Sequence, residues 1–136
     1  MNTNSHQNSA RDGELLFKEE AFAIVGAAME VYNELGFGFL ESVYQEGMER
    51  ESRLRSIPFE SQKVLRIKYK GEWLDKHFIA DLVCFGKIIV ELKCVPKISD
   101  VEIAQALNYL KATGLSLCLI INFGNPAKLE FKRVIR

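Results

Sequence analysis

The sequence predicts an α/β fold in which helices flank a mixed β-sheet, with the element order ααβββαββ. Three observations support this class. Apolar residues recur at helical spacing in three segments, short runs rich in β-branched residues alternate with polar ones, and an uninterrupted apolar run follows the third helical segment. The chain has 136 residues, 48% of them hydrophobic and 26% charged, which is the balance of one globular domain. We expect that domain to span residues 14–136.

The first 13 residues, MNTNSHQNSARDG, are polar and contain no apolar stretch of the kind an export signal needs. We therefore expect a disordered tail at residues 1–13. No apolar run approaches the roughly 20 residues that span a bilayer, so no membrane association is expected. Cys84, Cys94 and Cys118 are odd in number and lie in separate apolar runs, which favours reduced core residues. These features together predict a cytoplasmic protein.

Two helices are predicted at the start of the domain. In residues 14–36, four apolar residues recur at steps of three and four, and Gly36 provides a stop signal. These four are Phe22, Val25, Met29 and Tyr32. The second helix lies in residues 39–56 and ends before Pro58. Its apolar side is formed by Leu40, Val43, Tyr44, Gly47, Met48 and Leu54.

Three strands follow. Residues 63–69 alternate apolar and polar side chains, and Lys70-Gly71 is a turn signal before the next strand at 72–85. Gly86 then separates that strand from the third, at 87–94, which makes residues 78–94 a β-hairpin.

The third helix is predicted from Val101 to Thr113, because Ser99 and Glu102 have the spacing of a capping box and Gly114 ends the pattern. Residues 115–123 form an apolar run that predicts a strand buried on both faces. A last strand is predicted at 128–135. Because the third helix lies between strands 87–94 and 115–123, those two strands are expected to pair in parallel through a right-handed crossover.

Three charged residues interrupt the predicted hairpin: Asp81, Glu91 and Lys93. Side chains alternate between the faces of a strand, so Glu91 and Lys93 point the same way. On the partner strand, the same rule predicts that Asp81 shares its face with Ile79 and Val83. Ile89 shares the face of Glu91 and Lys93, whereas Ile88, Val90, Leu92 and Cys94 are expected to point into the core.

Asp81 and Glu91 are equally distant from Gly86. A loop of three or five residues centred there sets the two carboxylates opposite each other, with Cβ atoms about 5 Å apart. A two-residue loop would break that pairing. Such a pair repels by about 4 kcal/mol at 4 Å and an effective dielectric near 20. Mg²⁺ offsets this cost, because it takes oxygen ligands and is commonly held by one or two carboxylates. Lys93 would then orient a water or stabilise charge at phosphorus, which is the division of labour in metal-assisted phosphodiester hydrolysis.

A simpler interpretation stays open, in which Asp81, Glu91 and Lys93 line the solvated side of a two-faced hairpin. Two further features favour a site. Glu41 lies at the start of the second helix, where a first-turn acid is also common for electrostatic reasons alone. Gln105 and Tyr109 are one turn apart on the third helix, and so are able to act together or simply to form an amphipathic edge.

The chain has 18 Lys+Arg and 18 Asp+Glu residues, so it lacks the global positive charge of many nucleic-acid-binding proteins. Any phosphate contact must use a local patch, for which Arg66, Lys68 and Lys70 are candidates together with Lys63. The residues near the C-terminus are further candidates: Lys128, Lys132, Arg133 and Arg136. Each of these charges is equally explained as protection of a sheet edge against aggregation.

Several strings of this sequence resemble the GxxExxY protein family, a branch of the PD-(D/E)XK nuclease superfamily. Gly38, Glu41 and Tyr44 match the motif that names the family. The resemblance runs from about residue 24 to the C-terminus. It includes VYNELGFGFLESVY, IADLV, IIVELK, AQALNYLKATG and LIINFG.

The resemblance implies a restriction-endonuclease-like core with a catalytic site. By analogy, Asp81 and Glu91 would be metal ligands, Lys93 the catalytic lysine, and Glu41 a third acid near the metal or its water. Gln105 would orient groups or contact phosphate, while Tyr109 and Tyr44 would support the site.

The expected function is that of a nuclease using Mg²⁺ or Mn²⁺, with DNA as the expected substrate. We also expect a homodimer or a protein partner, because a core of this size has no separate specificity domain. The alternative is a non-catalytic module that keeps the fold and binds nucleic acid or protein.

Overall fold

The computed structural model describes residues 16–136, so the expected tail at residues 1–13 lies outside the described residues. The elements follow the predicted order ααβββαββ. The helices are α2 (Lys18–Leu35), α3 (Glu41–Leu54) and α4 (Asp100–Thr113). The strands are β1 (Phe59–Tyr69), β2 (Glu72–Cys84), β3 (Ile88–Lys93), β4 (Leu117–Asn122) and β5 (Glu130–Ile135).

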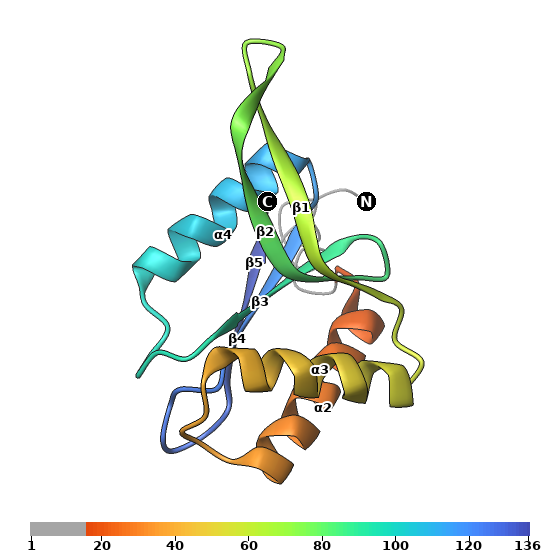
Figure 1. The fold of residues 1–136 in the computed structure, drawn as a ribbon, viewed down its shortest axis with the longest axis vertical. Coiled ribbons are helices and arrows are strands. Elements are labelled where there is room, and N and C mark those ends of the chain that lie inside the picture. Colours follow the sequence, from red (N-terminus) through yellow and green to blue (C-terminus); the bar gives the residue numbers. More distant parts are fainter. Residues whose placement is uncertain (1–15) are drawn as a thin grey trace, which may run out of the picture.

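The five strands form one mixed sheet in the order β1-β2-β3-β4-β5. β3 and β4 pair in parallel, with α4 between them in the chain, and the other neighbours pair antiparallel. The predicted parallel pair is therefore confirmed. Figure 1 shows α2 and α3 on one side of the sheet and α4 on the other, which makes three layers.

Two apolar clusters fill the spaces between the layers. The cluster under α2 and α3 includes Leu82, Val90 and Leu92 of the sheet, and the cluster under α4 includes Ile89 and Cys118. Consecutive residues of β3 and β4 thus enter opposite clusters, and all six residues of β4 are buried, as its apolar sequence predicts.

The hairpin of β1 and β2 extends well beyond the sheet, as Figure 1 shows. Its tip is the predicted two-residue turn, in which Lys70 and Gly71 both have positive φ, 51° and 85°. Such turns match the right-handed twist of paired strands. The pairing shifts register between Arg66 and Lys68.

The apolar side of α2 that the sequence predicted differs in part from the side that packs against α3 and the sheet. Phe22 is 81% exposed and Met29 is 47% exposed. The helix instead buries its small residues, together with Ile24 and Val31, because short side chains allow close approach to α3 and the sheet. On α3, Tyr44 and Met48 are buried as expected, whereas Leu40 and Leu54 are exposed, at the two ends of the helix.

No helix among residues 16–136 has the length and apolar character needed to cross a membrane.

A hydrogen-bonded junction holds the chain just after β3, next to Lys93. The side chain of Asn122, at the end of β4, is fully buried. Its Oδ1 accepts from Val95 N and Gly124 N at 2.9 and 3.0 Å. Its Nδ2 donates to Val95 O and to Glu130 Oε1 at 2.8 and 3.0 Å. All its polar groups are therefore used to fix the β3–α4 connection against β4 and β5.

Gly124 is needed for this close approach, because a Cβ there would overlap the backbone of Cys94 and Val95. We expect Gly124→Ala to lower the free energy of unfolding by about 3 kcal/mol or more, since backbone atoms cannot move aside as a side chain can. Urea unfolding measures this loss.

Gly86→Ala is the matched control, because Gly86 has φ 69° but no atom within 4 Å of a built Cβ. Its expected cost is only that of a left-handed alanine, about 1–2 kcal/mol. Equal losses for the two variants would contradict the steric explanation.

Candidate active site

The β2–β3 hairpin has the three-residue connection that the sequence allows. Leu82 pairs with Val90 and Cys84 with Ile88 around the turn that contains Gly86. Continuing this register by one pair sets Asp81 opposite Glu91. The two carboxylates therefore come from neighbouring strands, close enough to share a side-chain hydrogen bond.

The alternation of β2 slips by one residue at Asp81. Ala80 and Val83 both pack in the cluster under α4, although they are three residues apart. The prediction that Ile79 and Val83 share one face is therefore wrong, because a regular strand would separate Ala80 from Val83. On β1, Gln62 lies between the partners of Ala80 and Leu82 and has a positive φ of 52°. The irregularity thus affects both strands at the level of Asp81.

Backbone contacts fix Asp81 in this position. Its Oδ2 accepts a hydrogen bond from Leu92 N at 2.7 Å. Its own carbonyl oxygen accepts from Nε2 of Gln45, on α3, at 2.9 Å. Asp81 is consequently held by β3 and by α3 at once.

Glu91 is buried, with 6% of its surface exposed. Its Oε1 is a buried oxygen with no hydrogen-bond partner. The interpretation of a solvated hairpin face is therefore wrong for this residue, because α4 covers the side of the sheet from which water was expected. An unpaired carboxylate oxygen in such a place is costly unless a proton or a cation compensates it.

Burial, together with the charge of Asp81, raises the pKa of Glu91 to about 8 against the opposing effect of Lys93. Burial also raises the pKa of Asp81, while its hydrogen bond from Leu92 N lowers it. Because the charge of Asp81 raises the pKa of Glu91, the pair as a whole binds a proton more readily than an isolated carboxylate does. Binding of a proton or a cation would therefore stabilise the carboxylate pair.

Lys93 lies at the end of β3 and reaches α4. Its Nζ donates to Oε1 of Gln105 at 3.0 Å. Gln105 is set by the start of α4, where the predicted capping box of Ser99 and Glu102 is present. Lys93 and Gln105, which the sequence analysis named as separate candidates, are thus in direct contact.

Glu41, the first residue of α3, approaches the carboxylate pair from the opposite layer. Partial burial raises the pKa of Glu41, and the charge of Asp81 raises it further. Glu41 and Asp81 both line a cavity of about 430 Å³ that opens beside the pair. The other lining residues are Ser42, Gln45 and Gln62.

Within residues 16–136, no three His, Cys, Asp or Glu side chains are close enough together to hold a metal ion. Asp81 and Glu91 remain as a pair of carboxylates, with Glu41 across the cavity. This donor set fits a hard cation that takes few protein oxygens and keeps several waters, as Mg²⁺ does. The partnerless Oε1 of Glu91 is the observation that favours such a cation.

Tyr44 shapes the loop that leads to Glu41. Its ring is fully buried and stacks on Phe123, with centroids 4.4 Å apart. Its hydroxyl donates to Gly36 O and accepts from Phe39 N. Gly38 lies in the same loop with φ 112°, a conformation that a residue with a Cβ rarely adopts. The three residues of the G-x-x-E-x-x-Y string therefore bend the loop, supply the acid and anchor the turn.

Tyr109 supports the site rather than lining its cavity. Its ring stacks on Phe78 of β2 at 3.8 Å, and this stack joins α4 to the strand that carries Asp81. Burial raises the pKa of Tyr109, and the charges of Glu91 and Asp81 contribute.

The basic candidates lie away from the carboxylates. Arg66, Lys68 and Lys70 are exposed on the projecting hairpin, and Lys63 forms an ion pair with Glu60. The C-terminal group lies at the opposite edge of the sheet, where Arg133 donates to Leu16 O at 2.7 Å.

Three polar residues of the cavity were not predicted from the sequence: Ser42, Gln45 and Gln62. Gln45 is one turn after Glu41 on α3, and this spacing was a usable signal. Gln62 gave no signal, because only the irregularity of β1 turns it toward Asp81.

The three-layer architecture and a D…E-x-K site on a hairpin define a restriction-endonuclease-like fold. Residues 18–134 match the PD-(D/E)XK nuclease superfamily, so the chain belongs to that superfamily. Members of this superfamily generally use divalent metals.

A solved structure, "Crystal structure of SSO0001", is similar in fold with a TM-score of 0.56 and 15% sequence identity. The match covers 93% of this chain and 60% of that one, so the present chain spans about three fifths of its length. No curated protein matches the chain.

We expect the stability of the metal-free protein to fall as pH rises from 5.5 to 8.5. The pKa of Glu91 in the folded state, about 8, lies above its ordinary value of 4.5. The neutral form therefore stabilises the fold below pH 4.5, and this contribution is lost as pH rises through 8. Each pKa unit corresponds to about 1.4 kcal/mol, so the loss should be a few kcal/mol.

Urea unfolding in EDTA across this range measures the effect. Glu91→Gln keeps the shape of the side chain and should flatten the profile, whereas Glu46→Gln, on the exposed face of α3, should leave it as in the wild type. A wild-type profile that matches that of Glu91→Gln would contradict the assigned burial.

Tyr44→Phe should lower the free energy of unfolding by about 1–3 kcal/mol, because two backbone groups lose their shared partner while the ring stack remains. Tyr69→Phe is the control, since Tyr69 is 60% exposed and its loss should be small. Equal stability of the two variants in urea unfolding would show that the Tyr44 hydroxyl does not anchor the loop.

Proposed function

We propose that the chain is a metal-dependent nuclease of the GxxExxY branch, which hydrolyses phosphodiester bonds of DNA using Mg²⁺ or Mn²⁺. The observation that carries this proposal is the carboxylate pair. Asp81 and Glu91 are brought together with one oxygen partnerless, and Lys93 lies two residues after Glu91 on strand β3. A stable packing segment would not retain so costly a cluster.

The residues would act as follows. Asp81 and Glu91 would hold the cation, and Glu41 would contact it through water across the cavity. The cation supplies a Lewis acid that lowers the pKa of a bound water and neutralises charge on phosphate oxygens. Lys93 would place its ammonium against the charge that develops at phosphorus. Gln105 would hold that ammonium in position, as its 3.0 Å contact with Nζ supports.

The proposal includes a cytoplasmic setting and an assembly. All three cysteines are free, and Cys84 and Cys118 are buried, which fits a reducing compartment. Residues 16–136 form one three-layer unit, and a homodimer or a protein partner would complete a groove around nucleic acid.

We expect the wild-type protein to cleave at least one member of a panel of DNA and RNA substrates in Mg²⁺ or Mn²⁺. The panel includes duplex, nicked, branched and single-stranded forms. Glu91→Ala and Lys93→Ala should each reduce the rate by about 10² to 10³, because each removes charge stabilisation at the reacting phosphate. Glu46→Gln, which changes an exposed acid on α3, should cleave like the wild type.

Activity that survives both alanine substitutions would overturn the assigned site. Calorimetry with Mg²⁺ and Mn²⁺ tests the non-catalytic alternative directly. The wild type should bind metal and Asp81→Ala should not. Absence of binding in both proteins would leave only a module that binds nucleic acid or protein.

A further inference from the structure

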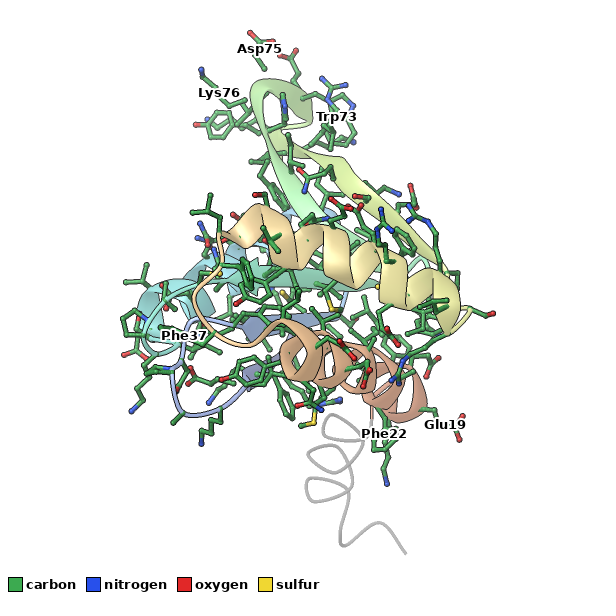
Figure 2. All side chains as sticks on the ribbon, turned by 60° about the horizontal axis from the view of Figure 1, so that its bottom comes forward. Glu19, Phe22, Phe37, Trp73, Asp75 and Lys76 are labelled. Atoms are coloured by element: carbon green, nitrogen blue, oxygen red, sulfur yellow. The ribbon has the colours of Figure 1, made fainter. Side chains whose placement is uncertain are left out.

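The β1–β2 hairpin forms an arm that stands out from the three layers, here defined as residues 63–78. Figures 1 and 2 show it extending beyond the body of the protein, with Trp73, Asp75 and Lys76 at its end. Its base is braced by the stack of Phe78 on Tyr109 of α4. The arm therefore projects from a fixed base, where Ile67, Lys68 and Phe78 line a cavity against α4.

The arm has an excess of positive charge, although the chain as a whole has a formal net charge of zero. Its two acidic residues are Glu72 and Asp75. Its basic residues are Lys63, Arg66, Lys68, Lys70 and Lys76. All of them except Lys63 are exposed, so the charge faces solvent and is available to an anionic partner.

Trp73, the only tryptophan of the chain, organises two of these charges. Arg66 Cζ lies 5.1 Å from the centre of its ring, and Lys68 Nζ lies 4.8 Å from it. Cation–π contacts of this kind hold the charged groups in place on one face of the ribbon. Because two cations already cover the indole, its role is to position them and not to offer a free platform for a nucleobase.

We propose that this arm enters the major groove of a DNA duplex and that Arg66 and Lys68, held by Trp73, contact its phosphates. This inference rests on the proposed function and specifies the form of the substrate. A two-stranded β-ribbon fits the major groove, which is about 12 Å wide. Proteins that bind single strands stack bases on free aromatic rings along a basic groove. On the arm, the ring of Trp73 is instead in contact with Arg66 and Lys68, which favours contacts to phosphates.

The arm and the site share strand β2, which runs from Glu72 at the tip to Asp81 and beyond. Eight residues separate Trp73 from Asp81, or about 25 Å of strand. At about 3.4 Å per base pair, this length corresponds to roughly seven base pairs of duplex. The arm would therefore grip the duplex that far from the bond at the site.

The test measures binding of the full chain to a 20-base-pair DNA duplex in EDTA, so that no cleavage occurs. Fluorescence anisotropy of labelled DNA gives Kd over a range of salt concentrations, and the emission of Trp73 reports contact at the arm. The wild type should bind the duplex at least about tenfold more tightly than the single strand of the same sequence. Its Trp73 emission should change on binding.

Arg66→Gln/Lys68→Gln should raise Kd for the duplex at least tenfold and reduce the slope of log Kd against log salt by about two, one for each lost phosphate contact. Trp73→Leu should also weaken binding, because both charges lose their support. Lys18→Gln/Arg50→Gln removes the same charge from the exposed surfaces of α2 and α3 and should bind like the wild type.

Unchanged binding by Arg66→Gln/Lys68→Gln, or a preference for the single strand, would overturn the proposal. These results are separable from failure of the proposed nuclease. If the wild type binds the duplex through the arm but does not cleave it in Mg²⁺, the arm proposal holds and the nuclease proposal fails. If Arg66→Gln/Lys68→Gln cleaves DNA and binds the duplex as tightly as the wild type, the nuclease proposal holds and the arm proposal fails.

Discussion

The burial of Glu91 beside Asp81 is the constraint on which the rest of the site depends. Two carboxylates on neighbouring strands, covered by α4 and approached by Glu41, cannot both carry charge there without compensation. The raised pKa of Glu91 and its partnerless Oε1 are both consequences of burying this negative charge without compensation. The sheet tolerates it because strong packing on both faces of β3 fixes the backbone that carries these groups.

Each helical layer holds one site residue in position through a local contact that does not involve the charged groups themselves. The ring of Tyr44 fills the core under α3 while its hydroxyl ties the preceding loop, and Glu41 follows from that loop. On the other face of the sheet, the capping box at Ser99 fixes where α4 begins. This start places Gln105 within hydrogen-bond distance of Lys93. The Asn122 junction limits the movement of the chain after Lys93. Rigid support of this kind is what a site with fixed charges needs.

Strand β2 connects two different kinds of surface. Its buried half carries Asp81 within the packed sheet, and its exposed half carries Trp73 in a ribbon with Arg66 and Lys68. The change of character along the strand explains how a chain with equal numbers of acidic and basic residues presents a local positive surface. A binding element and a reactive element on one strand would keep a constant separation, because a paired strand does not easily stretch or slide.

The sequence by itself determined the element order and the parallel pair, and it allowed a loop around Gly86 that sets Asp81 opposite Glu91. These features depend on side-chain periodicity and on turn or cap residues such as Gly86, Gly71 and Ser99, which act over a few residues. Only the tertiary structure decided that Glu91 is buried, that β2 slips at Asp81, and that α2 turns Phe22 outward. Alternation tells which residues share a face, but what covers that face depends on elements distant in the chain.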